Sequence, residues 1–154
     1  MKLSLFAIAL TLAALVAAQP LLAQNAFAPD QVKFGPAPPF LPPGAQLAVL
    51  EGDPAKDGPF VLRVKLPDGF KIAPHTHPMT ERLTVVSGTF YLGMGEKFDT
   101  KDGIEMSTGS FGYWKEGMKH FAWTKGETVI QLHGTGPWTI KYINPDDDPR
   151  NQKK

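Results

Sequence analysis

Beyond residue 45, apolar and polar positions alternate in short runs that are separated by turn residues. The clearest run is residues 60–66, where every second side chain is apolar and Arg63 and Lys65 lie between apolar neighbours. A period of two predicts a strand with one buried face. The predicted strands are residues 47–50, 60–66, 71–73, 82–86, 89–92, 104–106, 111–114, 128–133 and 138–143. Because no helical pattern separates them, they predict an all-β sandwich or barrel of the jelly-roll type.

Turn residues set the connections between these strands. Only Ser87 and Gly88 separate the runs 82–86 and 89–92, which predicts a tight hairpin. The chain's 15 Gly and 15 Pro also disfavour long helices. We therefore expect residues 45–143 to form one barrel and residues 144–154 to form a polar C-terminal tail.

Residues 24–44 differ from the barrel in composition. They contain six prolines, which exclude a helix and a central strand. They also carry Phe27, Phe34, Phe40 and Leu41. A solvated linker rarely exposes so much apolar surface, so we expect an extended Pro-rich arm that lies across the domain.

The first 23 residues predict a secretory signal peptide. Lys2 precedes an apolar stretch, residues 3–18, and Gln19 and Pro20 follow it. The stretch is short for a transmembrane helix, so we expect no stable membrane anchor. Cleavage after Ala23 and cleavage after Ala18 both remain open. The mature protein is expected to be exported, to the periplasm or the extracellular medium.

Composition narrows the function classes. The chain of 154 residues has a formal net charge of +1, and Lys2 is the only charged residue before Asp30. A balanced charge without a basic stripe argues against nucleic-acid binding. The absence of cysteine excludes disulfides, thiolate metal sites and a cysteine nucleophile.

Two stretches carry candidate metal ligands. His75 and His77 are two residues apart, so an extended chain points both to one face, and Glu81 follows four residues later. Two imidazoles and a carboxylate that face one interior suit a divalent metal. Further along, His120 comes three residues after the turn residue Gly117 and could complete a site of three histidines and one carboxylate.

Both stretches resemble the motifs of the cupin superfamily. Residues 69–88 match G-x5-H-x-H-x3-E-x6-G without a mismatch. Residues 109–124 resemble G-x5-P-x-G-x2-H-x3-N, with Gly109, Gly117 and His120 in place. Lys115 stands where the family has Pro, and Thr124 where it has Asn. The resemblance covers about residues 45–143, nearly the whole mature domain.

The resemblance implies a small single-domain cupin, a jelly-roll barrel that holds one metal ion through His75, His77, Glu81 and His120. Three nitrogens and one oxygen suit Fe, Mn, Ni, Co, Cu and Zn alike. Dimers are common in the family, so a homodimer is a further expectation. Cupins include dioxygenases, decarboxylases, isomerases and ligand-binding sensors, and the fold and ligands do not choose among these activities.

Other residues are candidates for roles around the metal. Glu81 or His133 could move protons during catalysis. His133 and Gln131 share one strand face, which could line the cavity or form an outward polar surface, and both alternatives remain open. Trp123 and Tyr113 are further candidates for the pocket wall.

Two functions therefore remain. The first is an exported, metal-dependent enzyme that acts on a small oxygenated molecule, with a dioxygenase-like oxidoreductase favoured. The alternative is a non-catalytic cupin module that binds a metal or a small ligand.

Overall fold

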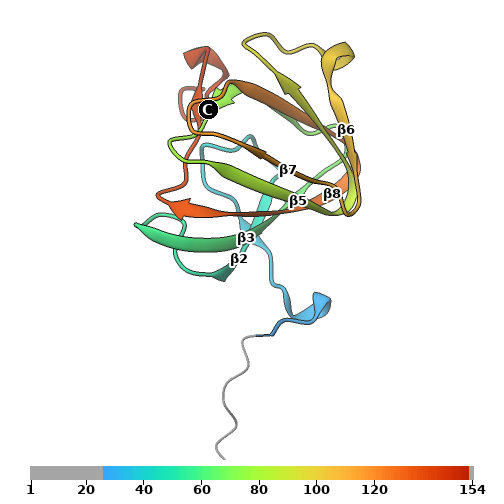
Figure 1. The fold of residues 1–154 in the computed structure, drawn as a ribbon, viewed down its shortest axis with the longest axis vertical. Helices are drawn as coiled ribbons and strands as arrows, with labels where there is room; N and C mark the ends of the chain where they lie inside the picture. The colour runs from blue at the N-terminus through green and yellow to red at the C-terminus, as the bar shows by residue number, and fades with distance from the viewer. Residues whose placement is uncertain (1–25, 153–154) are drawn as a thin grey trace, which may run out of the picture.

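A computed structural model describes residues 26–152 of the chain (Figure 1). The predicted signal peptide, residues 1–23, and both predicted cleavage sites lie outside the described residues. The strands are β1 (Gly35–Pro36), β2 (Gln46–Glu51), β3 (Gly58–Leu66), β4 (Lys71–Thr76), β5 (Glu81–Met94), β6 (Ile104–Ser107), β7 (Phe111–Trp114), β8 (His120–Gly136) and β9 (Lys141–Tyr142). Three single-turn 3₁₀ helices are η1 (Pro29–Gln31), η2 (Thr100–Asp102) and η3 (Pro145–Asp147). The predicted all-β fold is confirmed.

The long strands β5 and β8 are the framework of the molecule. They pair antiparallel along both of their halves, and each half leads into a different set of neighbours. One half continues through β3, β2 and β1 on one side and β7 on the other. The other half continues through β4 and β9 on one side and β6 on the other. The result is a jelly-roll in which two sheets share β5 and β8 and enclose one core.

The predicted hairpin at Ser87 and Gly88 is wrong, because β5 runs through these residues without turning back. The register of β5 against β8 shifts on either side of Ser87, as in a β-bulge. Gly88 has a φ of +82°, and a Cβ there would lie 2.5 Å from the Glu127 carbonyl oxygen. Gly88 therefore lets a continuous strand bend closely over its partner.

The remaining strand predictions hold: residues 111–114 form β7 as predicted, and the other strands have changed boundaries. β3 alternates as expected, with Phe60, Leu62, Val64 and Leu66 buried. The predicted strand at residues 128–133 is the second half of the longer β8. Of the predicted strand at residues 138–143, only Lys141–Tyr142 is a strand.

The Pro-rich arm lies against the barrel from β1 onward. β1 pairs with β2, and Leu41 is buried in the main core. The Phe40 ring meets Trp138 edge-on with centroids 5.1 Å apart, and the Phe40 carbonyl accepts a hydrogen bond from the Tyr142 hydroxyl at 2.8 Å. Phe27, near the start of the described residues, is exposed.

The C-terminal tail folds back where it is described, up to residue 152. Arg150 pairs with Asp148 and donates a hydrogen bond to the Ile140 carbonyl at 3.1 Å. No helix among residues 26–152 has the length and apolar character needed to cross a membrane.

Candidate metal centre

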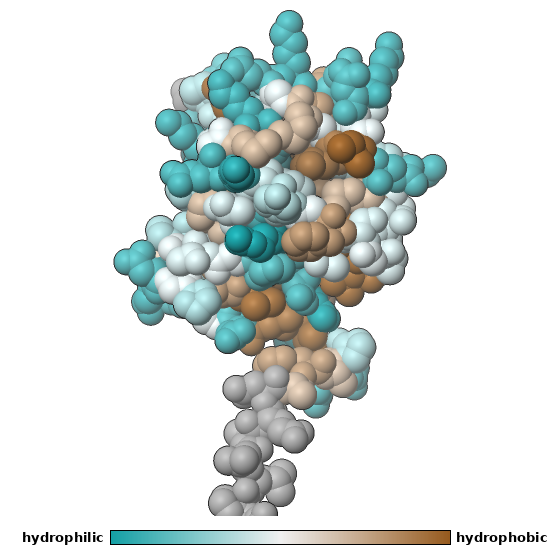
Figure 2. Space-filling model, viewed as in Figure 1, coloured by the Kyte–Doolittle hydropathy of each residue, from teal (hydrophilic) through white to brown (hydrophobic). Residues whose placement is uncertain are grey.

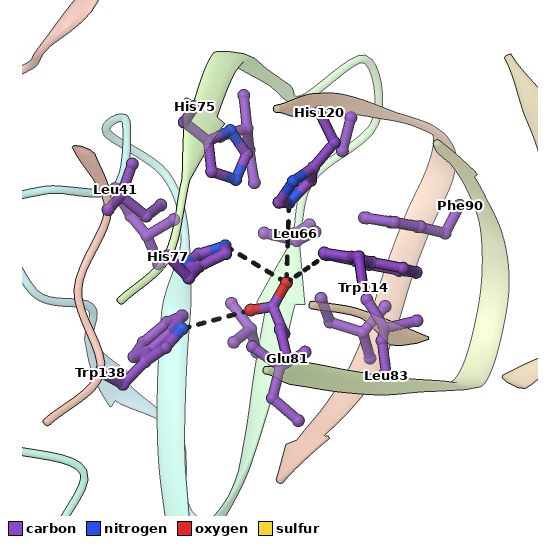
Figure 3. Close-up of a pocket in the computed structure, with 16 residues that line it drawn as sticks. Leu41, Leu66, His75, His77, Glu81, Leu83, Phe90, Trp114, His120 and Trp138 are labelled. Carbon is purple, nitrogen blue, oxygen red and sulfur yellow. Dashed lines mark hydrogen bonds and ion pairs between the residues drawn. The ribbon is translucent and has the colours of Figure 1, made fainter. Parts of the chain in front are cut away.

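The polar residues of the centre lie in an apolar cavity of about 30 Å³ inside the barrel (Figure 3). His75 comes from β4, His120 from the start of β8, and the two are register partners in the sheet. His77 follows β4, and Glu81 begins β5. The backbone N–H of Gly117 donates to the His77 carbonyl at 3.1 Å, which brings the turn before His120 next to His77.

Each imidazole is oriented by a hydrogen bond from its Nδ1 atom to a backbone carbonyl. His75 bonds to Ala73 at 2.7 Å, His77 to Thr139 at 2.8 Å and His120 to Met118 at 2.9 Å. A carbonyl oxygen only accepts, so Nδ1 carries the proton in each ring. The Nε2 atom of a neutral ring then keeps its lone pair for a metal.

One ring nitrogen from each of the three histidines lies within 4.8 Å of the others. The three side chains are buried, with 2–5% of each residue exposed. His77 Nε2 is buried without a hydrogen-bond partner. A buried polar nitrogen without a partner costs free energy, and a bound cation would satisfy it.

The Glu81 carboxylate faces the histidines with one oxygen. Its Oε2 atom lies 3.3 Å from His77 Nε2 and 3.8 Å from His120 Nε2. Trp114 donates its indole N–H to Oε2 at 2.9 Å, and Trp138 donates to Oε1 at 3.2 Å. Figure 3 shows Glu81 as the point where these interactions meet. Two fixed donors thus hold the carboxylate in one orientation.

The pKa shifts of the four residues favour protonation states that can bind a cation. Burial lowers the pKa of His75 well below its usual range and also lowers the pKa of His120. Burial acts the same way on His77, but the Glu81 carboxylate outweighs it and raises the pKa of His77. Burial opposes ionisation of Glu81, yet the imidazoles, His77 first, lower its pKa to about 2. At neutral pH, Glu81 is therefore ionised, and His75 and His120 are neutral.

The residues present fit a divalent metal ion. Three oriented imidazoles and one carboxylate are nitrogen and oxygen donors that suit first-row transition metals. The negative charge of Glu81 favours a cation, and the apolar wall keeps bulk water away. The structure brings the four predicted ligands together, while their bonds to a metal stay a prediction.

The other predicted site residues lie elsewhere. Ile130 and Leu132 of β8 line the cavity, so Gln131 and His133 are on the opposite face of that strand. Gln131 accepts a hydrogen bond from Arg63, and the ring of His133 stacks beside Phe111. This corrects the interpretation in which Gln131 and His133 line the cavity, and it removes His133 as a candidate proton carrier at the metal.

Trp123 and Tyr113 also do not line this cavity. Trp123 stacks on Tyr91 with ring centroids 5.0 Å apart. Tyr113 is exposed and lines a separate surface hollow. The sequence pattern placed Trp123 near the cavity because it follows His120 by three residues, but an odd spacing on a strand points to the other face.

Sequence reasoning missed the contribution of Trp114 and Trp138 to the centre. Both are buried, and their N–H groups donate hydrogen bonds to Glu81. The arm residue Leu41 likewise lines the cavity from outside the barrel sequence. One property could have indicated these contacts from the sequence: the N–H group of a buried tryptophan usually needs a hydrogen-bond acceptor.

The two departures from the second motif are accommodated locally. The turn that contains Lys115 closes through a hydrogen bond from the Met118 N–H to the Lys115 carbonyl at 3.1 Å. Thr124 Oγ1 accepts from the Phe70 N–H at 3.0 Å and donates to the Pro67 carbonyl at 2.7 Å. Thr124 thus ties β8 to the turn before β4.

Solved structures with a similar fold come from several bacteria. The polyketide cyclase RemF from Streptomyces resistomycificus aligns with a TM-score of 0.64 and 15% identity, over 80% of this chain and 88% of that chain. A candidate acetylacetone dioxygenase from Methylibium petroleiphilum PM1 aligns with a TM-score of 0.59 and 19% identity, over 80% and 84%.

An RmlC-like cupin from Shewanella frigidimarina aligns with a TM-score of 0.55 and 12% identity, over 71% of this chain and 87% of that chain. No protein-family model matches the sequence, and no curated protein is similar to it. At these identities, the similarities concern the fold alone.

Proposed function

We propose that this protein, which has the cupin fold, is an exported mononuclear-metal enzyme acting on a small oxygenated molecule, with dioxygenase chemistry favoured. One observation carries the proposal. Three buried imidazoles, each with Nδ1 bonded to a carbonyl, bring ring nitrogens within 4.8 Å of one another beside an ionised carboxylate. A structural metal site does not need a cavity beside its ligands. Histidines on a protein surface do not need their rings fixed by hydrogen bonds.

The ligands proposed for the metal are His75, His77, His120 and Glu81. A divalent ion held there would supply Lewis-acid or redox chemistry, depending on the metal. The chain itself does the rest: the carbonyls of Ala73, Thr139 and Met118 fix the rings, and the apolar lining excludes water.

Glu81 is proposed to neutralise positive charge at the centre. Its pKa of about 2 keeps it ionised, and the indole N–H groups of Trp114 and Trp138 hold both of its oxygens. A carboxylate fixed in this way changes orientation only by breaking a hydrogen bond. It is therefore suited to hold a cation at a constant position.

Dioxygenase chemistry is favoured for two reasons. The donor set accepts Fe(II) and other metals that react with O₂. A similar structure is described as a candidate acetylacetone dioxygenase, so this fold is associated with that chemistry in another bacterium. We further propose export by a cleaved signal peptide, no binding to nucleic acid, no membrane anchor, and a homodimer.

Oxygen uptake tests the enzymatic function. The metal-free protein is loaded in turn with Fe(II), Mn(II), Co(II), Ni(II), Cu(II) and Zn(II), and O₂ consumption is recorded with catechol, a flavonol and acetylacetone. We expect uptake with at least one pair of metal and substrate, and none with His77→Ala under the same loading. His133→Ala is the matched control, because His133 lies outside the cavity.

A contrary result would point to the alternative function. Ligand-induced spectral shifts without O₂ consumption or product, for all six metals, would indicate a non-catalytic binding module. Protein that takes up none of the metals at stoichiometric loading would refute the proposed metal centre itself.

A further inference from the structure

Exposed apolar side chains gather at one place on the described surface. Among residues 26–152, seven large hydrophobic residues are exposed, and five of them line a single hollow. These five are Met94, Ile104, Phe111, Tyr113 and Met118. Figure 2 shows apolar residues on the face where Figure 1 places β6 and β7. Scattered apolar residues need no explanation, but a cluster that lines one hollow indicates a binding surface.

The hollow, which we call the β6–β7 groove, is lined by residues of β5, β6 and β7 and of the segments next to them. β6 and β7 each pair only with β5 among the described strands, so neither closes the gap to the other. The groove has a volume of about 400 Å³ and is walled by the five exposed residues, with Trp114 in its lining. Sites for small molecules are concave and of this size.

Trp114 is shared by the groove and the metal cavity. Its side chain is buried, its indole N–H donates to Glu81 Oε2 at 2.9 Å, and its ring centroid lies 5.4 Å from that of His120. The metal cavity measures only about 30 Å³, room for an ion and little else. The body of an organic ligand must therefore lie outside that cavity, and the groove is the adjoining hollow.

The chemistry of the groove defines the class of ligand. Its one acidic side chain, Glu105, already accepts a hydrogen bond from the Tyr91 hydroxyl at 2.7 Å. No lysine, arginine or histidine lines it. A charged ligand would lose hydration without gaining a partner, whereas an aromatic or alkyl body gains apolar contact.

We propose that the β6–β7 groove binds the body of an uncharged aromatic or alkyl molecule, and that Trp114 is the partition between this molecule and the metal cavity. The assignment of this molecule as substrate rests on the proposed function. Contact between the molecule and the metal ligands requires the Trp114 ring to move. That movement breaks its hydrogen bond to Glu81, so entry is coupled to the orientation of the carboxylate.

The methionines provide a direct test. Met94, Met106 and Met118 line the groove, whereas Met79 does not line it and packs against Gly134. The purified protein is labelled with ¹³C at the methionine methyl groups and titrated with 2-naphthol in the metal-free state. We expect saturable shifts of the three groove methyl signals and no shift of Met79.

A matched pair of substitutions locates the binding. Ile104→Asp places a charge in the groove at a residue that is 63% exposed, so the fold tolerates it. Val49→Asp makes the same change on β2 at a residue that is 47% exposed and remote from the groove. We expect Ile104→Asp to weaken 2-naphthol binding about tenfold or more and Val49→Asp to leave it within about twofold.

Three outcomes would overturn the proposal. The first is no shift of the groove methyl signals, and the second is an equal shift of Met79. The third is a monomer–dimer equilibrium abolished by Ile104→Asp, which would show that a second copy covers the groove. Because binding is measured without metal, failure of the proposed function would appear separately, as bound 2-naphthol with no turnover of any substrate by the metal-loaded protein.

Discussion

At the scale of single residues, the centre is defined by which side chains present a lone pair and which only orient their neighbours. His77 has a buried Nε2 without a hydrogen-bond partner, next to Glu81. His133 lies on the other face of β8 and stacks beside Phe111. The two histidines are therefore a natural pair for comparison.

We expect His77→Ala to abolish metal binding at stoichiometric loading, because a coordinate bond to the metal is lost. His133→Ala should retain about one metal per chain, since nothing at the centre changes. Metal per chain is measured by plasma mass spectrometry after desalting at near-neutral pH, because protonated imidazoles do not bind metals. The reverse result, loss in His133→Ala and retention in His77→Ala, would show that the ligand set is wrong.

The indole hydrogen bonds to Glu81 lead to a second prediction. Trp138→Phe keeps an aromatic ring but removes the donor to Oε1. Loss of a group that orients a metal ligand typically costs about 10–100-fold in metal affinity. Chelator competition should show a decrease of that order for Trp138→Phe and little change for Trp123→Phe, which stacks on Tyr91 outside the cavity. Equal affinities of the two variants would mean that the indole N–H does not position Glu81.

The candidate ligands could be predicted from sequence because their spacing is local: His75, His77 and Glu81 lie within seven residues. The contacts of Glu81 with Trp114 and Trp138 could not, since they span 33 and 57 residues. The predicted alternation around Gln131 and His133 was also correct, but alternation alone does not show which face of the strand points into the barrel. The pairing of β8 with β3 and β5 places Ile130 and Leu132 beside buried residues, so these two side chains point inward.

At the scale of elements, the positions of most strands could be predicted, but it could not be predicted that residues 82–86 and 89–92 belong to one continuous strand, β5. Ser87 and Gly88 suit a hairpin turn and a bulge equally well, because a glycine with positive φ occurs in tight hairpin turns and in one common type of bulge. The long-range partner decides between them: β8 runs beside β5 on both sides of the bulge. A local sequence signal contains no information about that partner.

The arm is an element whose contribution to stability can be measured. Phe40 packs edge-on against Trp138, while Phe27 is 51% exposed. We expect Phe40→Ala to lower the free energy of unfolding by about 1–3 kcal/mol, through lost burial and the lost aromatic pair. Phe27→Ala should change it by less than about 0.5 kcal/mol. Denaturant unfolding measures both, and equal small effects would mean that the arm adds no stability through Phe40.

At the scale of the whole molecule, the barrel formed by the described residues encloses the three histidines and Glu81 in a largely apolar cavity. The arm supplies Leu41 to the cavity wall, so the part of the arm that contains Leu41 contributes to the candidate site. A mature protein that begins after residue 23 would keep this segment intact. A start beyond Leu41 would remove this residue from the cavity wall.

Export is the prediction that belongs to this scale. An apolar stretch after Lys2, too short to span a bilayer, is expected to direct secretion and then be removed. Mass spectrometry of protein from the exporting host should show a first residue of Gln24, or of Gln19 if cleavage follows Ala18. Leu12→Arg should block export by placing a charge in the apolar stretch, so that uncleaved chain accumulates in the cell. Chain that retains Lys2 and fractionates with the membrane would show instead that the stretch is an anchor, and the protein would then act at the membrane surface.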